Sequence, residues 1–261
     1  MEVSTYQSIE TELKGNIAYI RFNRPKSLNA LNTEMIKELV ACLNEIKMNT
    51  GIQIVVLQGN ETGFSSGGDI KEMLQLAGQE QFFVIMDQIN ELITTLYTMP
   101  KLTIAAINGA AAGLGLSIAL ATDHIISDIN SKFAMNFIGI GLVPDGGGHF
   151  LLELRIGENK AKKLIWDGKV LTAKEAYELE LIDEVADQVQ VALVNKINLW
   201  KSKPLAAMIE TKQIYVELKR QSLLKAFELE KNAQWKMRQT IDHKEGIKAF
   251  VEKRKPNFIG R

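Results

Sequence analysis

Two short apolar runs constrain the fold most, because each leads through a glycine turn into a helical segment. Residues 54–57 (Ile-Val-Val-Leu) precede the turn Ser66-Gly67-Gly68, and residues 102–107 (Leu-Thr-Ile-Ala-Ala-Ile) precede a second turn at 113–115 (Gly-Leu-Gly). Continuous apolar runs of this length are typical of strands that are covered on both faces. Strands that alternate with helices in this way predict an α/β fold.

The rest of the chain extends this alternation to about residue 185 and then becomes helical and charged. Further strands are predicted at 16–22 and 124–127, and helices from residue 32, at 70–73, at about 79–97 and at 114–120. Leu223, Phe227 and Leu229 indicate an apolar face in the C-terminal part. We therefore expect an α/β core at residues 1–195 and a helical oligomerisation region at residues 196–261, which packs on its own subunit or on a neighbour.

Composition narrows the class of partner. The chain of 261 residues has 31 Lys and Arg and 31 Asp and Glu, a balance that favours neither nucleic acid nor an anionic membrane. Its single cysteine, Cys42, cannot form an intrachain disulfide, which is typical of a reducing compartment. The first residues show no signal peptide, and no apolar run is long enough to span a membrane. We expect a cytoplasmic protein.

The two glycine turns predict a site for negative charge. Free N–H groups at the start of a helix stabilise an anion, or a carbonyl that is becoming one. If the turns converge, they form an oxyanion hole, in which each donor contributes about 3–4 kcal/mol to a transition state. Either turn can equally be a tight strand-to-helix connection. Neither matches a dinucleotide or P-loop pattern, since 113–115 lacks the third glycine and no Gly-Lys-Ser/Thr occurs.

One carboxylate stands out beside these turns. Asp145 follows Val143-Pro144 and precedes three glycines, where it is either a single acid–base group or an ordinary turn or N-cap residue. Asp69 and Glu72 complement a helix dipole, and Asp123 fits a buried capping residue. The three histidines show no ligand spacing, so no metal site is predicted; His149 alone is a candidate to line a pocket.

Five segments, in order, match a known family from about residue 8 to residue 258. They are residues 29–32 (Asn-Ala-Leu-Asn), 64–73 (Phe-Ser-Ser-Gly-Gly-Asp-Ile-Lys-Glu-Met), 105–109 (Ala-Ala-Ile-Asn-Gly), 141–144 (Gly-Leu-Val-Pro) and 245–254. Together they resemble the crotonase superfamily, the enoyl-CoA hydratases and isomerases. The resemblance implies a crotonase-like spiral of ββα units, a C-terminal trimerisation region, and a homotrimer or hexamer. It also implies an enzyme of acyl-CoA metabolism, with coenzyme A as part of the substrate and no separate cofactor.

The resemblance assigns roles to particular residues. The backbone N–H groups of Gly68 and Leu114 are the implied oxyanion donors. The implied contacts to the coenzyme A moiety lie on backbone atoms around Ser27, Leu28, Ala30 and Ser66, and Gly68 belongs to the same loop. Lys26 and Lys253 are weaker candidates for its phosphates, because surface lysines are ordinarily just solvated.

The sequence departs from the hydratases at both of their glutamates. The implied positions hold Ser117 and Phe137, which cannot activate water as a carboxylate pair does. Asp145 stands where several isomerases of the superfamily have their acting carboxylate. We therefore expect an enoyl-CoA isomerase in which apolar neighbours, Phe137, Ile138 and Leu142, raise the Asp145 pKa. The alternatives are a hydratase-like lyase or thioester hydrolase, and a non-catalytic acyl-CoA-binding protein.

Overall fold

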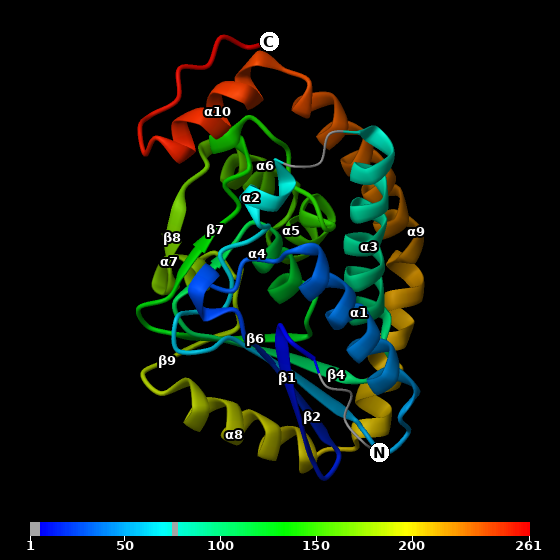
Figure 1. The fold of residues 1–261 in the computed structure, drawn as a ribbon. Coiled ribbons are helices and arrows are strands. Elements are labelled where there is room, and N and C mark those ends of the chain that lie inside the picture. Colours follow the sequence, from blue (N-terminus) through cyan, green and yellow to red (C-terminus); the bar gives the residue numbers. More distant parts are fainter. Residues whose placement is uncertain (1–5, 75–77) are drawn as a thin grey trace.

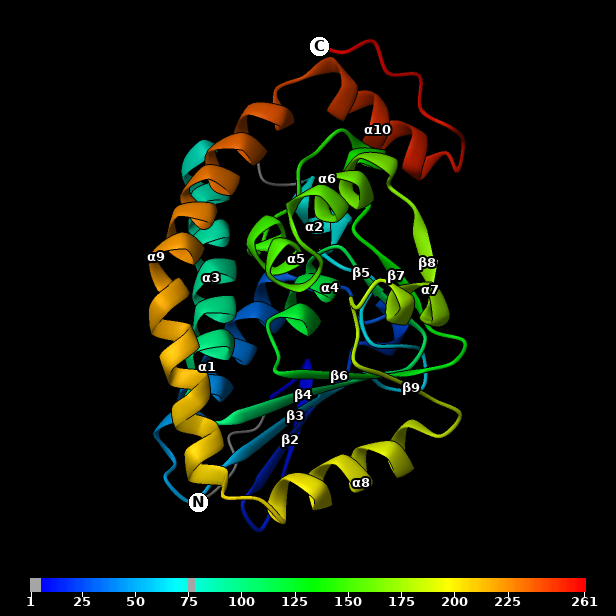
Figure 2. The same cartoon turned by 180° about the vertical axis from the view of Figure 1, so that it is seen from behind.

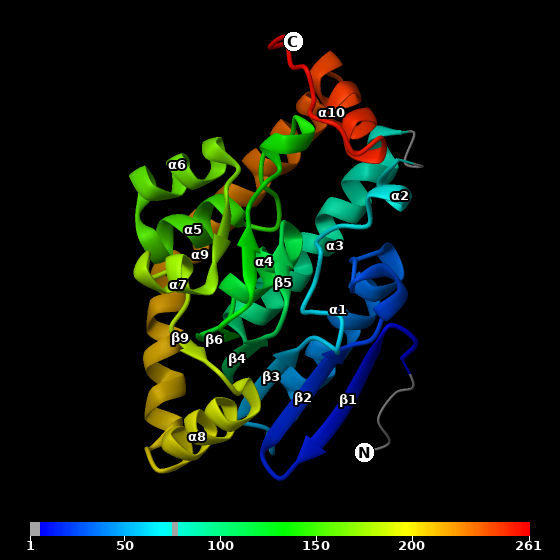
Figure 3. The ribbon, with the colours of Figure 1, turned by 90° about the vertical axis from the view of Figure 1, so that its left-hand side faces the viewer.

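The computed structural model describes residues 6–74 and 78–261, and its centre is a six-stranded sheet. The strand order is β1-β2-β3-β4-β6-β9, and all neighbours are parallel except the β1–β2 hairpin, which lies at one edge (Figure 3). The strands are β1 (Ile9–Lys14), β2 (Ile17–Phe22), β3 (Ile54–Gln58), β4 (Leu102–Ile107), β6 (His124–Asp128) and β9 (Glu184–Ala186). The predicted α/β class is confirmed.

Helices cover both faces of this sheet (Figure 1). The helices of the described residues are α1 (Thr33–Met48), α2 (Ile70–Met73), α3 (Gln79–Thr98), α4 (Leu114–Leu120), α5 (Gly148–Ile156), α6 (Glu158–Asp167), α7 (Ala173–Glu178), α8 (Val189–Lys201), α9 (Leu205–Arg238) and α10 (Ile241–Val251), with short 3-10 turns η1 (Pro25–Ser27) and η2 (Ile138–Ile140). A second sheet joins β5 (Ala110–Ala112), β7 (Lys132–Ala134) and β8 (Val170–Thr172).

Alternate residues of the central strands build two separate cores. In β3, Ile54 and Val56 face α8, whereas Val55 and Leu57 face the larger core with α1, α3 and α4. Since side chains alternate across a strand, a strand that is buried on both sides reads as a continuous apolar run. This is the physical reason for the two runs that identified β3 and β4.

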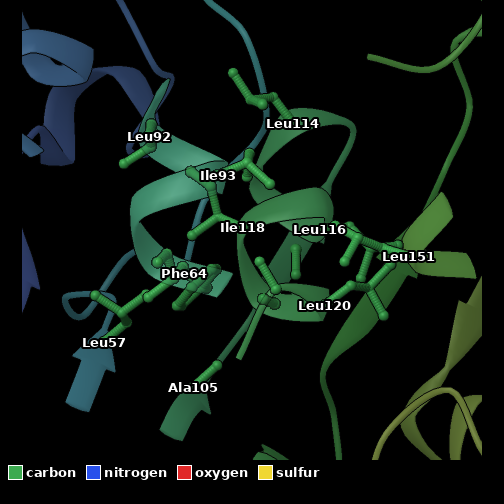
Figure 4. Close-up of a cluster of buried hydrophobic side chains, with 14 of the residues drawn as sticks. Leu57, Phe64, Leu92, Ile93, Ala105, Leu114, Leu116, Ile118, Leu120 and Leu151 are labelled. Carbon is green, nitrogen blue, oxygen red and sulfur yellow. The ribbon is translucent and has the colours of Figure 1, made fainter. Parts of the chain in front are cut away.

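The short helix α4 is buried on every side, as expected for a helix that is apolar all round. Its side chains Leu116, Ile118 and Leu120 lie among Leu92 and Ile93 of α3 and other residues of the larger core (Figure 4). The structure places α4 over the predicted residues, 114–120. Leu114, the first residue of α4, is therefore held in a fixed position at the end of a buried helix.

The C-terminal helices wrap around this core. The long helix α9 runs beside α3, and α10 crosses one end of the molecule above η2 (Figures 1 and 2). His243 of α10 contacts the carbonyl oxygen of Ile140 through Nδ1 at 2.8 Å. The predicted boundary between residues 195 and 196 falls inside α8, and the division into two regions stays a prediction. Within the described residues, no helix is long and apolar enough to cross a membrane.

Candidate active site

The two glycine turns lie directly against each other. The Ser65 amide donates to the Ala110 carbonyl at 2.9 Å, and the Ala112 amide donates to the Ser65 carbonyl at 3.0 Å. A Cβ on Gly115 would lie only 2.7 Å from the Cβ of Ser65, so this contact requires glycine. The sequence predicts each turn separately, and the structure joins them in one parallel bridge.

Each turn ends in an amide group that the protein leaves free. Gly67, with a φ of 97°, precedes Gly68, and Gly113, with a φ of 51°, precedes Leu114. A Cβ on Gly67 would lie 2.8 Å from the Ala112 carbonyl oxygen, which explains the glycine at that position. Across residues 6–74 and 78–261, no acceptor receives a hydrogen bond from the Gly68 or the Leu114 N–H. Both donors are available to a ligand.

Gly68, Leu114 and Asp145 together line two adjoining cavities. The larger, of about 270 Å³, extends towards η2 and α10 and is also lined by Phe137, Leu142 and Phe250, among others. The smaller, of about 30 Å³, extends between α1 and α3 and is mostly apolar. Met73 lines both cavities. An apolar pocket with a few polar groups at one point is the usual form of a small-molecule site.

Asp145 is the buried carboxyl group of this site. Its side chain does not cap a helix, because α5 begins at Gly148 and the Gly148 amide donates to the Asp145 backbone carbonyl at 3.1 Å. Its Oδ2 accepts a hydrogen bond from Gln234 Nε2 at 3.4 Å, and Oδ1 is buried with no partner among the described residues. Burial, and secondarily the charge of Glu230, raises the Asp145 pKa to about 8.

The apolar surroundings of Asp145 differ in part from the expected set. Phe137 and Leu142 do line the larger cavity, but Ile138 is 37% exposed and lines neither cavity, so its predicted contribution is wrong. The smaller cavity supplies instead a group of apolar side chains from α1 and α3: Ile36, Phe82, Ile85, Met86 and Ile89. Leu114, which provides a free amide, adds its own side chain to this group.

Glu230 and Gln234 of α9 are buried behind Asp145, and sequence reasoning missed both. The predicted apolar face included Leu229, which is exposed; the buried face of α9 instead continues from Leu223 and Phe227 to these two polar residues. Residues 223, 227, 230 and 234 are separated by four, three and four positions, which is the spacing of one face of a helix. This spacing could have assigned Glu230 and Gln234 to the buried face. His149, a candidate to line the pocket, lines neither cavity, and its ring nitrogen Nδ1 lies 2.8 Å from Glu230.

The two positions that the resemblance assigns to the hydratase glutamates carry no carboxylate. Ser117 is fully buried, and its hydroxyl donates to the backbone carbonyl of Asp145 at 3.0 Å, so it supports the Asp145 loop. Phe137 lines the larger cavity. Among the described residues that line that cavity, Asp145 is thus the only one with an ionisable group.

Other acidic residues near the site are occupied by protein partners. Asp69 pairs with Arg24 at 3.2 Å, and Glu72 accepts the Thr33 amide at 2.9 Å, although both line the smaller cavity. Asp123 lies elsewhere, bound to Thr103 and Lys212. In the described part of the chain, no group of three or more His, Cys, Asp or Glu side chains could hold a metal ion.

The residues predicted to contact coenzyme A lie in two places. Ser66 lines the larger cavity, and its amide donates to the Leu28 carbonyl at 3.0 Å, which brings the segment containing Ser27 and Ala30 beside the first glycine turn. Leu28 is exposed in a left-handed conformation, with a φ of 51°. Lys26 and Lys253 are exposed; Lys26 is in η1 and Lys253 lies just beyond α10, and neither lines the cavities. Their binding roles stay predictions.

The chain is similar to known proteins over almost its whole length. The profile of the enoyl-CoA hydratase/isomerase family matches residues 12–261. YhaR of Bacillus subtilis (strain 168), provisionally named an enoyl-CoA hydratase/isomerase, is 49% identical over 251 residues, which are 96% of this chain and 98% of YhaR. The 1,2-epoxyphenylacetyl-CoA isomerase of Escherichia coli (strain K12) is 30% identical, over 97% of this chain and 98% of that protein. The crystal structure of an enoyl-CoA hydratase from Mycobacterium avium subsp. paratuberculosis K-10 superposes with a TM-score of 0.88 and 28% identity, covering 98% of this chain and 100% of that one.

Proposed function

This chain belongs to the enoyl-CoA hydratase/isomerase family, and from that premise we propose that it is an enoyl-CoA isomerase whose proton carrier is Asp145. The observation that carries the proposal is the Oδ1 atom of Asp145, buried without a partner in cavities that the free amides of Gly68 and Leu114 also line. A buried carboxyl group without a hydrogen-bond partner costs stability, and groups kept at such a cost cluster at functional sites. The substrate is an acyl-CoA thioester with a double bond between the β- and γ-carbons.

The reaction needs one base and one site for negative charge. Ionised Asp145 takes a proton from the α-carbon, and the electrons of that C–H bond form a dienolate whose charge rests on the thioester oxygen. The N–H groups of Gly68 and Leu114 hold this oxygen, as oxyanion donors do. Protonated Asp145 then returns its proton to the γ-carbon, which leaves the double bond conjugated with the thioester.

The raised pKa of Asp145 suits this role. A base is most effective when its pKa approaches the operating pH, and Asp145, with a pKa of about 8, is far stronger than an exposed aspartate. At pH 7 about one molecule in ten is ionised and can act as the base. Hydration is disfavoured because Ser117 and Phe137 leave the larger cavity without a second carboxylate to activate water.

The remaining family features enter as part of this proposal. The coenzyme A moiety is bound by Ser27, Leu28, Ala30, Ser66 and Gly68. Lys26 and Lys253 are further contacts to its phosphates. Three copies of the chain, or two sets of three, form the active enzyme. The enzyme needs no cofactor besides the coenzyme A of its substrate.

A direct assay separates this proposal from its alternatives. We expect the protein to convert 3-hexenoyl-CoA into 2-hexenoyl-CoA, followed by the absorbance of the conjugated thioester and by mass detection. Asp145→Asn should lower kcat by roughly 10²–10⁴-fold, since it removes the base. Asp87→Asn, an exposed aspartate of α3 paired with Lys231, is the matched control and should keep full activity.

Three results would contradict the proposal. Formation of 3-hydroxyhexanoyl-CoA from 2-hexenoyl-CoA would indicate a hydratase. Release of free coenzyme A would indicate a thioester hydrolase. Tight binding of coenzyme A with no turnover of either thioester would indicate a non-catalytic binding protein.

A further inference from the structure

Two polar side chains of α9 are buried directly behind Asp145. Glu230 is 3% exposed and Gln234 fully buried, one helical turn apart, in the stripe that Leu223 and Phe227 begin. Neither residue lines the two cavities. Two apolar side chains would fill these positions at lower cost, because buried polar groups must recover their lost hydration. Their contacts show what they do for the site.

Glu230 holds the loop that carries Asp145. Its Oε2 accepts the Gly147 amide at 2.7 Å, and its Oε1 accepts the His149 amide at 3.0 Å and contacts His149 Nδ1 at 2.8 Å. Both oxygens therefore act as acceptors, the arrangement of an ionised carboxylate. These contacts fix the backbone just after Asp145 and satisfy free amides at the start of α5.

Gln234 holds one of the two carboxyl oxygens of Asp145. Its Nε2 donates to the carbonyl oxygen of Val143 and also, at 3.4 Å, to Oδ2 of Asp145. With Oδ2 held from behind, Oδ1 is the oxygen left without a partner. A side-chain amide that is anchored on the backbone two residues before Asp145 resists rotation of the carboxyl group.

The charges around Asp145 favour uptake of a proton. Glu230 places a second negative charge behind it, and no described cation is hydrogen-bonded or ion-paired to Asp145. Asp69 and Glu72 lie across the smaller cavity, but Asp69 is paired with Arg24 and Glu72 with a backbone amide. His149 Nδ1 contacts Oε1 of Glu230 at 2.8 Å. When Asp145 accepts the proton from the α-carbon, its repulsion from Glu230 is relieved, which makes Asp145 a stronger base.

We propose that Glu230 and Gln234 are positioning residues for the proton transfer: Gln234 aims Oδ1 at the acyl group, and Glu230 fixes the loop and drives protonation of Asp145. This inference rests on the proposed function, because it requires Asp145 to carry the proton. It adds two residues of α9 to a site whose described cavity-lining residues lie before residue 146, apart from Phe250 of α10.

Two variants test the role of Glu230 and the role of Gln234, with 3-hexenoyl-CoA as substrate. Glu230→Gln removes the charge, so the acid limb of the kcat/KM profile should move down by about one pH unit, and kcat at its plateau should fall about tenfold because the base is weaker. Gln234→Met keeps the length of the side chain but has no donor. It should lower kcat roughly 10–100-fold with KM changed less than about twofold, since the carboxyl group is misaligned.

Glu228→Gln is the matched control for the loss of charge. It makes the same substitution on the same helix, but Glu228 is exposed and pairs with Lys225, so both the pH profile and kcat should stay unchanged. Thermal unfolding of each variant shows whether it is folded. If Glu230→Gln does not fold, Gln234→Met, which keeps the carboxylate that holds the loop, still decides the outcome.

The results distinguish failure of this inference from failure of the proposed function. If Asp145→Asn abolishes turnover but both α9 variants keep the wild-type kcat and pH profile, the inference is wrong and the proposed function stands. A lower melting temperature with an unmoved acid limb and unchanged kcat would show a purely structural role and would also overturn it. If Asp145→Asn leaves isomerisation intact, the proposed function fails first.

Discussion

Asp123 and Asp145 show two opposite uses of a carboxylate in one molecule. Oδ2 of Asp123, between β4 and α9, accepts the Thr103 amide, the Thr103 hydroxyl and Lys212 Nζ, all within 2.9 Å. Asp145 is more deeply buried, yet it has one long hydrogen bond and one oxygen without a partner. The carboxylate of Asp123 joins β4 to α9 through hydrogen bonds. The carboxyl group of Asp145 instead keeps one oxygen unsatisfied, which costs stability. Such a difference in pairing is a physical mark of function.

The largest expected effect is on the free energy of unfolding, which the buried carboxyl group of Asp145 lowers as pH rises. Because its pKa of about 8 lies above the usual value of 3.8, the unfolded chain releases this proton between pH 4 and 8 while the folded chain keeps it. Wild-type stability is therefore undiminished below pH 4 and falls as pH rises towards 8. Asp145→Asn removes this dependence and should gain about 5 kcal/mol relative to wild type at pH 8. Urea unfolding at pH 4 and pH 8 measures it; an equal difference at both values would contradict the assignment.

Asp123 should respond in the opposite direction. Asp123→Ala leaves the ammonium group of Lys212, whose side chain is 8% exposed, without its carboxylate, and removes the acceptor of two Thr103 donors. We expect a loss of about 2–3 kcal/mol in the free energy of unfolding, because the carboxylate itself is partly exposed. Asp123→Ala combined with Lys212→Met should recover part of it. A gain in stability would break the comparison between the two aspartates.

The third expectation is a pH dependence of the reaction. Since Asp145 must be ionised to accept a proton, kcat/KM should rise about tenfold per pH unit below 8 and level off above it. Initial rates with 3-hexenoyl-CoA across this range give the profile. A rate that is flat between pH 6 and 8 would mean that a group with an ordinary aspartate pKa, or no carboxylate, controls the step.

The smallest effect is expected at the surface. Asp87 forms an ion pair with Lys231 at 2.7 Å, but its side chain is 59% exposed. Asp87→Asn should change the free energy of unfolding by less than about 0.5 kcal/mol, because solvent and salt screen such pairs. Urea unfolding at low and high salt checks this baseline. A larger change would show that ion pairing, and not burial, decides how much an aspartate contributes to the free energy of unfolding.

Local patterns were enough to predict most of the elements around the site. The apolar runs identify β3 and β4, the glycines identify the two turns, and Asn32 begins the cap of α1 by accepting the Met35 amide. Each of these features depends on residues close together in sequence. The second sheet and the hairpin strand β1 were missed, since their short or polar strands show no buried run.

The support of Asp145 could not be predicted in the same way. Glu230 and Gln234 are 85 and 89 residues away from it, and only the path of α9 brings them together. The family resemblance indicated the carboxyl group and the two amides, whose roles stay predictions. It gave no information about α9, so the source of the negative charge behind Asp145 came from the structure alone.

The unbroken length of α9 has a mechanical consequence. The same helix binds Asp123 through Lys212 and Asp145 through Gln234. Lys212 and Gln234 are about 33 Å apart along the helix axis, and the number of residues between them fixes the angle between their side chains. Inserting one residue between them would rotate the far anchor by about 100° and turn Gln234 out of the protein interior. Relatives that use an aspartate in this way should therefore keep the residue count of this stretch fixed, even where its exposed positions differ.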